Sequence, residues 1–245
     1  MTVLLDRFRS RFLARERPLK FVPPVVAAAL AVSLLGQVAW HGLQPRPVPV
    51  VSALKPPPAS ALLRVAAFGD QVTLSRLLML WLQSFDYQPG ISIPFKNLNY
   101  RMIIAWLGRI LDLDPRSQYP LLSAARVYSL VPDNAKKREM LAFVERRFLK
   151  APNERWPWMA HAIFVAKHQL KDMKLALRLA RELRTRATGP NVPYWAKQME
   201  LFVLDDMGDQ QDAKILLGGL IASGQITDPN QIRFLMQRLN DTKKK

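Results

Sequence analysis

Residues 21–40 read FVPPVVAAALAVSLLGQVAW and contain no charged side chain. At a rise of about 1.5 Å per residue, a helix of this length spans a hydrocarbon core of roughly 30 Å. Pro23 and Pro24 fall in its first turn, where a missing N–H is tolerated, and Trp40 ends the run where an aromatic ring favours the interface. No other stretch is as long and as apolar, so we expect one transmembrane helix over residues 21–42.

Basic residues are concentrated before this run. Residues 1–20 form a basic head, whereas Arg46 and Lys55 are the only Lys or Arg residues in the twenty positions after Trp40. The positive-inside rule therefore predicts a bacterial inner-membrane protein with a cytoplasmic N-terminus and a periplasmic C-terminal domain. The alternative is a cleavable signal peptide, but the run is longer than a usual signal sequence and residues 38–40 match the cleavage pattern poorly.

Length, net charge and cysteine content limit the domain size and the binding partners of the remaining chain. The 245 residues leave room for one soluble domain with a core. The formal net charge of +17 predicts attraction to anionic lipid, acidic proteins, nucleic acid or anionic polysaccharide. Nucleic acid is the least expected of these for a periplasmic domain. Cysteine is absent, which excludes disulfides and thiolate metal sites.

The segment after the apolar run is rich in proline. Residues 45–58 read PRPVPVVSALKPPP, which favours extended polyproline II structure. We therefore predict a semi-rigid linker over residues 43–58 that holds the body off the membrane. The body is predicted over residues 59–240, followed by a basic tail at residues 241–245.

The body is periodic from about residue 99. Aligning the sequence with itself at an offset of 37 residues matches Pro115 with Pro152, Pro120 with Pro157, Trp158 with Trp195, and Asp172 with Asp209. Repeats of this length indicate stacked supersecondary units. Each unit contains two helical patterns and almost no strand pattern, so the predicted fold class is all-α. The expected first helices cover 119–130, 157–169 and 193–207, and the second helices cover 135–149, 175–185 and 211–222. Helices over 59–67 and 71–85 precede these units, and a capping helix over 230–239 follows them.

Several of these residues resemble the tetratricopeptide repeat family. The sequence LDLDP at 111–115 is similar to the end of such a repeat, and GDQQDA at 208–213 is similar to its interhelix turn. Trp158 and Trp195 fall near the family's large aromatic position, which implies a core role for Trp158. The resemblance implies stacked helix hairpins. The chain departs from the family in its longer unit and in Ala151 before Pro152, which leaves the superhelical pitch open.

The resemblance also implies a groove lined by the first helices. A groove with mixed apolar and charged walls suits an extended peptide or a partner helix. Trp156 is predicted to lie either in the core or on this surface, and the apolar loop at 87–95 is predicted either to pack on the body or to bind a partner. The candidate partner-binding residues are Arg126, Met159, Ile163, Lys167, Glu200, Trp156, Ile91, Ile93 and Phe95.

Basic residues on the second helices form a further candidate surface. If successive second helices lie side by side, these residues form a stripe that would bind an anionic polysaccharide or lipid surface. A solvated helix face is the alternative. The residues are Lys136, Lys137, Arg138, Arg178, Arg181 and Arg184.

Motifs of catalysis are not found in the sequence. It contains no glycine-rich phosphate loop and no nucleophile motif, and no acidic residue stands at ligand spacing between His161 and His168. We therefore expect no enzyme activity, no cofactor and no metal site. The predicted function is a membrane-anchored scaffold or assembly factor that binds a protein at the membrane. Binding of an anionic polymer or lipid is the second hypothesis, and an enzyme is a remote third.

Overall fold

The computed structural model describes residues 22–43, 53–88 and 91–241. The basic head at 1–20, residues 242–245 of the basic tail and part of the proline-rich linker lie outside these residues. The chain divides into two compact units, residues 1–49 and 50–245.

The first unit contains helix α2 (Pro24–Leu43), the apolar helix expected from the sequence. The carbonyl of Pro23 accepts its first backbone hydrogen bonds, from the N–H groups of Val26 and Ala27. Proline at the first helical position costs no intrahelical bond. The helix is long and apolar enough to cross a membrane, and none of its residues is buried. These properties fit a membrane anchor and also fit a signal sequence.

The second unit, the body, confirms the all-α fold class. Its α-helices in the described residues are α3 (Ser60–Ala66), α4 (Gln71–Gln83), α5 (Tyr100–Leu113), α6 (Tyr119–Leu122), α7 (Asn134–Phe148), α8 (Pro152–Phe164), α9 (Met173–Arg186), α10 (Tyr194–Lys197), α11 (Met199–Asp206), α12 (Gln210–Ala222) and α13 (Pro229–Asp241). Short 3₁₀ segments are η2 (Ser84–Asp86), η3 (Phe95–Asn97) and η5 (Tyr128–Leu130), and π-helical turns are η4 (Ser123–Val127) and η6 (Val165–Gln169).

A small hairpin interrupts the helices, although almost no sheet was expected. Strand β1 (Tyr87–Gln88) pairs antiparallel with β2 (Ile91–Ser92), with Tyr87 opposite Ser92 and Gln88 opposite Ile91. Strands this short carry no alternating pattern that would reveal them in the sequence.

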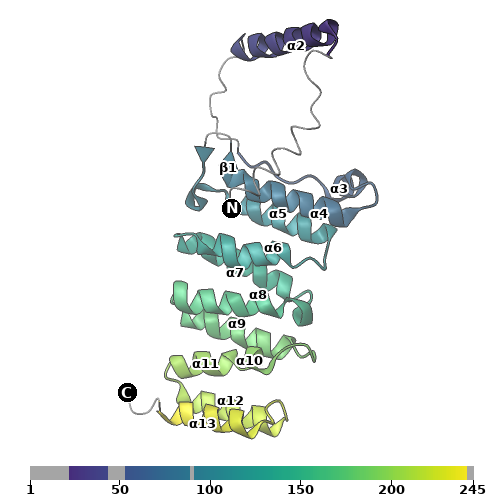
Figure 1. The fold of residues 1–245 in the computed structure, drawn as a ribbon. Coiled ribbons are helices and arrows are strands. Elements are labelled where there is room, and N and C mark those ends of the chain that lie inside the picture. Colours follow the sequence, from purple (N-terminus) through teal and green to yellow (C-terminus); the bar gives the residue numbers. More distant parts are fainter. Residues whose placement is uncertain (1–21, 44–52, 89–90, 242–245) are drawn as a thin grey trace, which may run out of the picture. The chain divides into compact units, whose positions relative to one another are not determined.

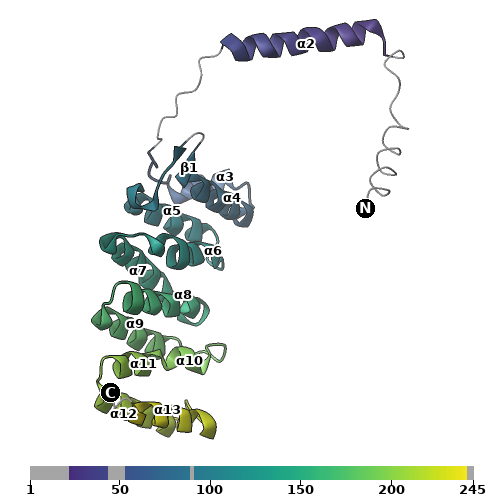
Figure 2. The same cartoon turned by 60° about the vertical axis from the view of Figure 1, so that its left-hand side comes forward.

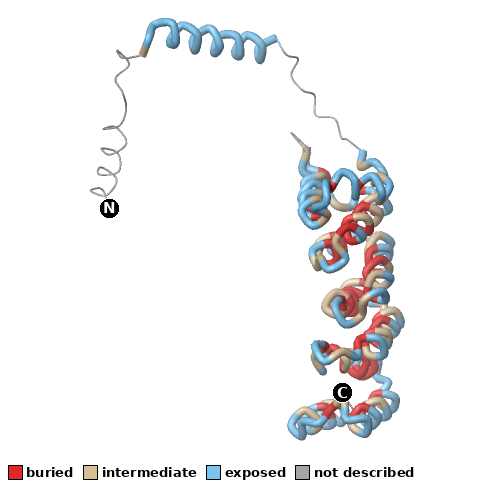
Figure 3. The backbone as a smooth tube through the Cα atoms, turned by 90° about the vertical axis from the view of Figure 1, so that its right-hand side faces the viewer, coloured by how far each residue is buried: buried red, intermediate tan, exposed pale blue. Residues whose placement is uncertain are grey.

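The helices of the body pack in sequential pairs (Figures 1 and 2). Helix α4 packs on α5, α6 with its η4 extension packs on α7, and α8 packs on α9. Helix α11 packs on α9 and α12, and α13 closes the stack against α12. The buried residues gather where the helices face one another (Figure 3).

Each second helix begins at an Asp or Asn side chain. Asp133 accepts hydrogen bonds from the N–H groups of Ala135 and Lys136 at the start of α7, at 2.9 and 3.1 Å. Asn99, Asp172 and Asp209 cap α5, α9 and α12 in the same way. An oxygen at this position satisfies N–H groups that the helix itself leaves unbonded, so these residues set where each second helix starts.

The predicted start of α8 is wrong, and the first helix predicted over 193–207 is divided into α10 and α11. The sequence predicted a first helix starting at Pro157, but α8 starts at Pro152. Both prolines can occupy a first helical turn, and Pro152 takes that position. Pro157 lies inside the helix, where its ring removes one backbone hydrogen bond.

The last residues of the proline-rich segment lie on the body. The indole Nε1–H of Trp106 in α5 donates a hydrogen bond to the carbonyl oxygen of Lys55 at 2.8 Å. Leu54 packs against the main core cluster. Part of the predicted linker at 43–58 therefore belongs to the folded body, because a buried indole and an apolar surface of α5 hold it.

Candidate partner-binding groove

A groove opens between the first helices near the C-terminal end of the body. We call it the Phe164 groove, and its volume is about 230 Å³. It is lined by Ile163, Phe164, Lys167, His168, Met199, Phe202, Val203 and Arg238. These residues come from α8, η6, α11 and α13, so the groove needs three successive layers of the stack.

One wall of the groove is an aromatic stack. The ring of Phe164 lies between two histidine rings, with centroids 5.9 Å from His161 and 4.7 Å from His168. The spacings of three and four residues place the three rings on one helix face. Phe164 remains 48% exposed, so its ring is available for contact. The two histidines, which could have been read as a metal pair, instead flank a phenylalanine.

The opposite wall combines Phe202 with charged side chains. The Arg238 guanidinium lies over the Phe202 ring, 5.0 Å from its centroid. Arg238 also forms an ion pair with Asp205 at 2.8 Å. Lys167 forms an ion pair with Asp206 across the groove mouth. The two cations that line the groove are thus each paired with a carboxylate of α11, which balances the charge of the mouth, although Asp205 itself is buried.

A π-helical turn shapes this site. In η6 the N–H of Leu170 bonds to the carbonyl of Val165, five residues earlier, at 3.0 Å. The wider turn rotates the side chains of Lys167 and His168 relative to a regular α-helix. The first helix of the preceding unit contains a similar turn in η4, which carries Arg126. Such turns are common at functional sites.

The dimensions of the groove favour a side chain over a free ligand. Pockets for drug-sized molecules usually hold about 300–1,000 Å³. The Phe164 groove is smaller and open, with aromatic walls and a charge-balanced mouth. These features are typical of a pocket that takes one large apolar side chain of a protein partner.

The predicted groove residues separate into exposed and buried sets. Arg126 is exposed, and Lys167 lies at the mouth of the Phe164 groove. Met159 and Ile163 are buried in the core, and only Ile163 reaches the groove floor. Glu200 is also buried, so its carboxylate is unavailable to a partner. The resemblance to a repeat protein placed Glu200 in an open groove. In the structure its side chain instead faces the neighbouring helix α9.

The tryptophans of α8 are partly buried. Trp156 packs edge-to-face against Trp195 of α10, with ring centroids 5.4 Å apart. The Nε1–H of Trp158 donates to Oε1 of Gln118 at 2.6 Å, and the ring packs against the core. Both side chains thus join neighbouring units.

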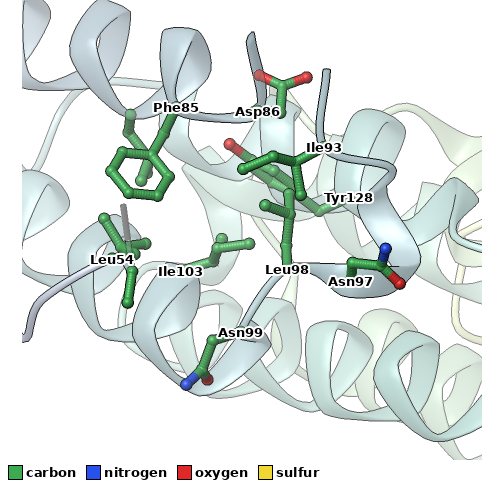
Figure 4. A pocket seen from close by; sticks show the side chains of 11 residues that line it. Leu54, Phe85, Asp86, Ile93, Asn97, Leu98, Asn99, Ile103 and Tyr128 are labelled. Carbon is green, nitrogen blue, oxygen red and sulfur yellow. The ribbon is translucent and has the colours of Figure 1, made fainter. Parts of the chain in front are cut away.

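Two described residues of the 87–95 loop, Ile93 and Phe95, pack on the body. Ile93 is buried, and Phe95 packs edge-to-face on Tyr128, with centroids 5.9 Å apart. Ile91 lies in β2. Ile93 also lines a second pocket of about 200 Å³, in which Leu54, Phe85, Leu98 and Ile103 converge (Figure 4). The linker residue Leu54 forms part of its wall.

Most residues of the predicted basic stripe have partners. Arg138 pairs with Asp172 at 2.5 Å, and Arg178 pairs with Glu145 and Glu182. Arg181 and Arg184 both bind Glu200, at 3.0 and 2.6 Å. Lys136 donates to the backbone carbonyls of Lys96 and Leu98. Lys137 forms no ion pair within the described residues. Apart from the Arg178–Glu182 pair within α9, these contacts join different elements of the body, and the ion pairs reduce the free positive charge of this surface.

Acidification is expected to destabilise the Phe164 groove. Burial, and the nearby Arg126 charge, hold the pKa of His161 below its usual value. The unfolded chain therefore binds this proton more readily than the folded chain, so stability falls as the pH drops through about 6.5. Thermal melting between pH 7.5 and 5.5 should show a larger loss for the natural chain than for His161→Gln. Equal losses would contradict this assignment.

Sequence reasoning missed Phe164, Phe202 and Arg238. Phe164 and Phe202 are 38 residues apart, close to the repeat offset, and this spacing was the available signal. Arg238 comes from the last helix, outside the repeats, and spacing gives no indication of it. Comparison of the chain with protein-family models, with curated proteins and with solved structures finds no match.

Proposed function

We propose that this chain is a membrane-anchored helical-repeat protein of the tetratricopeptide type that binds another protein through the Phe164 groove. Helix α2 acts as an uncleaved anchor in a bacterial inner membrane, with the basic head in the cytoplasm and the body in the periplasm. The protein serves as a scaffold or assembly factor for a membrane complex. No catalytic step is part of this proposal.

The observation that carries the proposal is the exposed aromatic stack at an open groove. Phe164 keeps about half of its surface exposed beside a charge-balanced mouth. Aromatic side chains surrounded by polar groups are typical of interface hot spots. Helix pairs stacked in sequence provide the extended surface on which repeat proteins bind peptides.

The alternative, binding of an anionic polysaccharide or lipid by the second helices, has less support. It depends on the six basic residues from Lys136 to Arg184, and four of these are arginines paired with carboxylates. An anion would have to compete with those carboxylates, which lowers the affinity of each contact.

A photo-crosslinking residue at position 164 of the full chain tests the proposal in intact cells. We expect a discrete crosslinked product with a membrane-associated protein. The same residue at exposed Ile215 of α12 is the matched control and should give no such product.

A second change separates specific docking from proximity. Phe202→Ser removes the opposite wall of the groove, and Arg126→Glu reverses an exposed charge whose field reaches His161 of the aromatic stack. Either change should reduce the crosslinked product severalfold while the helical circular dichroism is kept. Identical products from positions 164 and 215, or no effect of either change, would refute binding through this groove.

A further inference from the structure

The first layer of the body is apolar on its outer face as well as its inner face. Leu63, Met79 and Leu82 of α3 and α4 are buried inside the body. On the outside, Leu62, Val65, Phe68, Val72, Leu77, Leu80 and Trp81 are exposed, and we call these residues the first-layer face. Phe68 is 96% exposed and Leu77 is 57% exposed. End helices of stacked-repeat proteins usually turn a polar face outward, so this end of the stack is unusual.

The last layer shows the contrast. Helix α13 exposes Phe234 and Met236, but it also exposes Asn230, Arg233, Gln237 and Asn240 among them. On α4, the exposed residues Leu77, Leu80 and Trp81 follow one another at three- and four-residue spacing, which places them on one helix face. Thr73 and Arg76 are also exposed on this side of α4, so polar groups interrupt the apolar residues. The exposed apolar side chains lose free energy in water and gain it when covered.

The charged residues of this layer indicate which kind of surface covers the first-layer face. The only charged residues of α3 and α4 are Arg64 and Arg76, both exposed and without an ion pair among the described residues. Asp70, in the turn between the helices, accepts a hydrogen bond from the N–H of Thr73 and acts as a helix cap. Apolar residues with tryptophan and arginine, and few acidic groups, are typical of helices that lie in a membrane interface.

A short stretch of chain connects α2 with the first attachment to the body. Helix α2 ends at Leu43, and the chain is fixed to the body again at Leu54 and Lys55. The nine residues 44–52 between the described segments span at most about 30 Å when fully extended. Helix α3 then begins at Ser60, only a few residues after this attachment.

We propose that the first-layer face docks on the anionic phospholipid surface of the membrane in which α2 is anchored. This docking replaces the expectation that the proline-rich linker holds the body off the membrane, because residues 54 and 55 are fixed on the body. Leu62, Val65, Phe68, Leu77 and Leu80 enter the interface, while Arg64 and Arg76 bind lipid phosphates. This inference rests on the proposed role of α2 as an anchor. A second copy of the chain fits less well, because a symmetric contact would bring four arginines, Arg64 and Arg76 of each copy, together with only the two Asp70 carboxylates, which already cap α4.

The absence of cysteine makes a site-specific test direct. Leu77→Cys, the control Ile215→Cys and the anchor variant Ala31→Cys are each labelled with an environment-sensitive fluorophore in the full chain. The proteins are placed in nanodiscs of phosphatidylcholine and phosphatidylglycerol. Iodide then quenches labels in water, and lipids with brominated acyl chains quench labels in the interface or core.

We expect the label at 77 to be quenched by brominated lipid and to be severalfold less sensitive to iodide than the label at 215. Iodide quenching equal to that at 215 overturns the proposal. Protection from iodide without quenching by brominated lipid also overturns it, since this result indicates a protein contact. The label at 31 separates the two hypotheses: lipid quenching at 31 but not at 77 refutes only the docking, and its absence at 31 refutes the anchor.

The arginines provide the second arm. Removing a cation near an anionic surface weakens binding by about fivefold. Arg64→Gln with Arg76→Gln should therefore lower the lipid-quenched fraction at position 77, and added salt should lower it in the natural chain. The same two changes should have a much smaller effect in nanodiscs of phosphatidylcholine alone, whose phosphates are neutralised by choline and whose surface carries no net charge. An unchanged fraction in the anionic nanodiscs overturns the role of lipid phosphates.

Discussion

Replacing Arg181 and Arg184 together by methionine is expected to lower the free energy of unfolding by about 3–5 kcal/mol. The reason is the position of Glu200, whose side chain is only 4% exposed and is neutralised by these two guanidinium groups. Without them a carboxylate is left buried without a compensating charge. Urea denaturation of the detergent-solubilised full chain, followed by circular dichroism, measures the change.

The reverse substitution provides the control. Glu200→Gln leaves two arginines, of which Arg181 is 59% exposed and can be solvated by water. Its cost should be nearer about 1–2 kcal/mol, the loss of charged hydrogen bonds without a stranded buried charge. Equal losses of stability in the two variants would show that Glu200 is accessible to water and that the predicted difference between the variants is wrong.

Arg155→Ala is expected to lower the free energy of unfolding by about 2–5 kcal/mol. Arg155 is buried, and its guanidinium donates to the carbonyl oxygens of Arg147 at 2.6 Å and Pro115 at 3.0 Å. Burial, together with the charge of Arg147, holds its pKa below the usual value. Truncation leaves the Pro115 carbonyl without this donor, removes one of two donors to the Arg147 carbonyl, which also accepts from the N–H of Lys150, and leaves a cavity where three layers meet.

Two variants separate these contributions in the same denaturation experiment. Arg155→Met retains most of the apolar stem, so it should recover the packing part of the loss but not the hydrogen bonds. Arg186→Ala, at an exposed position on α9, should change stability by less than about 0.5 kcal/mol. Full recovery by methionine would show that the carbonyl contacts contribute nothing.

The sequence predicted the helices of the body because local signals determine them. Apolar periodicity, acidic caps such as Asp133 and the turn at Gly208 recur along the chain, and each acts within a few residues. The start of α8 was mispredicted because two prolines both satisfied the same local rule. The apolar helix α2 was evident from composition alone.

The candidate site was harder to predict because it depends on distant contacts. The burial of Glu200 results from arginines sixteen and nineteen residues away on another helix. The π-helical turns at η4 and η6 have no sequence signal of their own. The Phe164 groove needs α13 to close it, and no repeat spacing connects Arg238 to Lys167.

The bond between Trp106 and the Lys55 carbonyl has a mechanical consequence. A pull on the chain from its N-terminal side reaches residues 54 and 55 before it reaches α3, so the load passes into α5 through the indole and the packed leucine. Helix α5 is held by α4 on one side and by α6 and α7 on the other, so tension is shared by the first layers and does not peel away the end helix. The attachment therefore protects the outer helix α3 from tension on the chain.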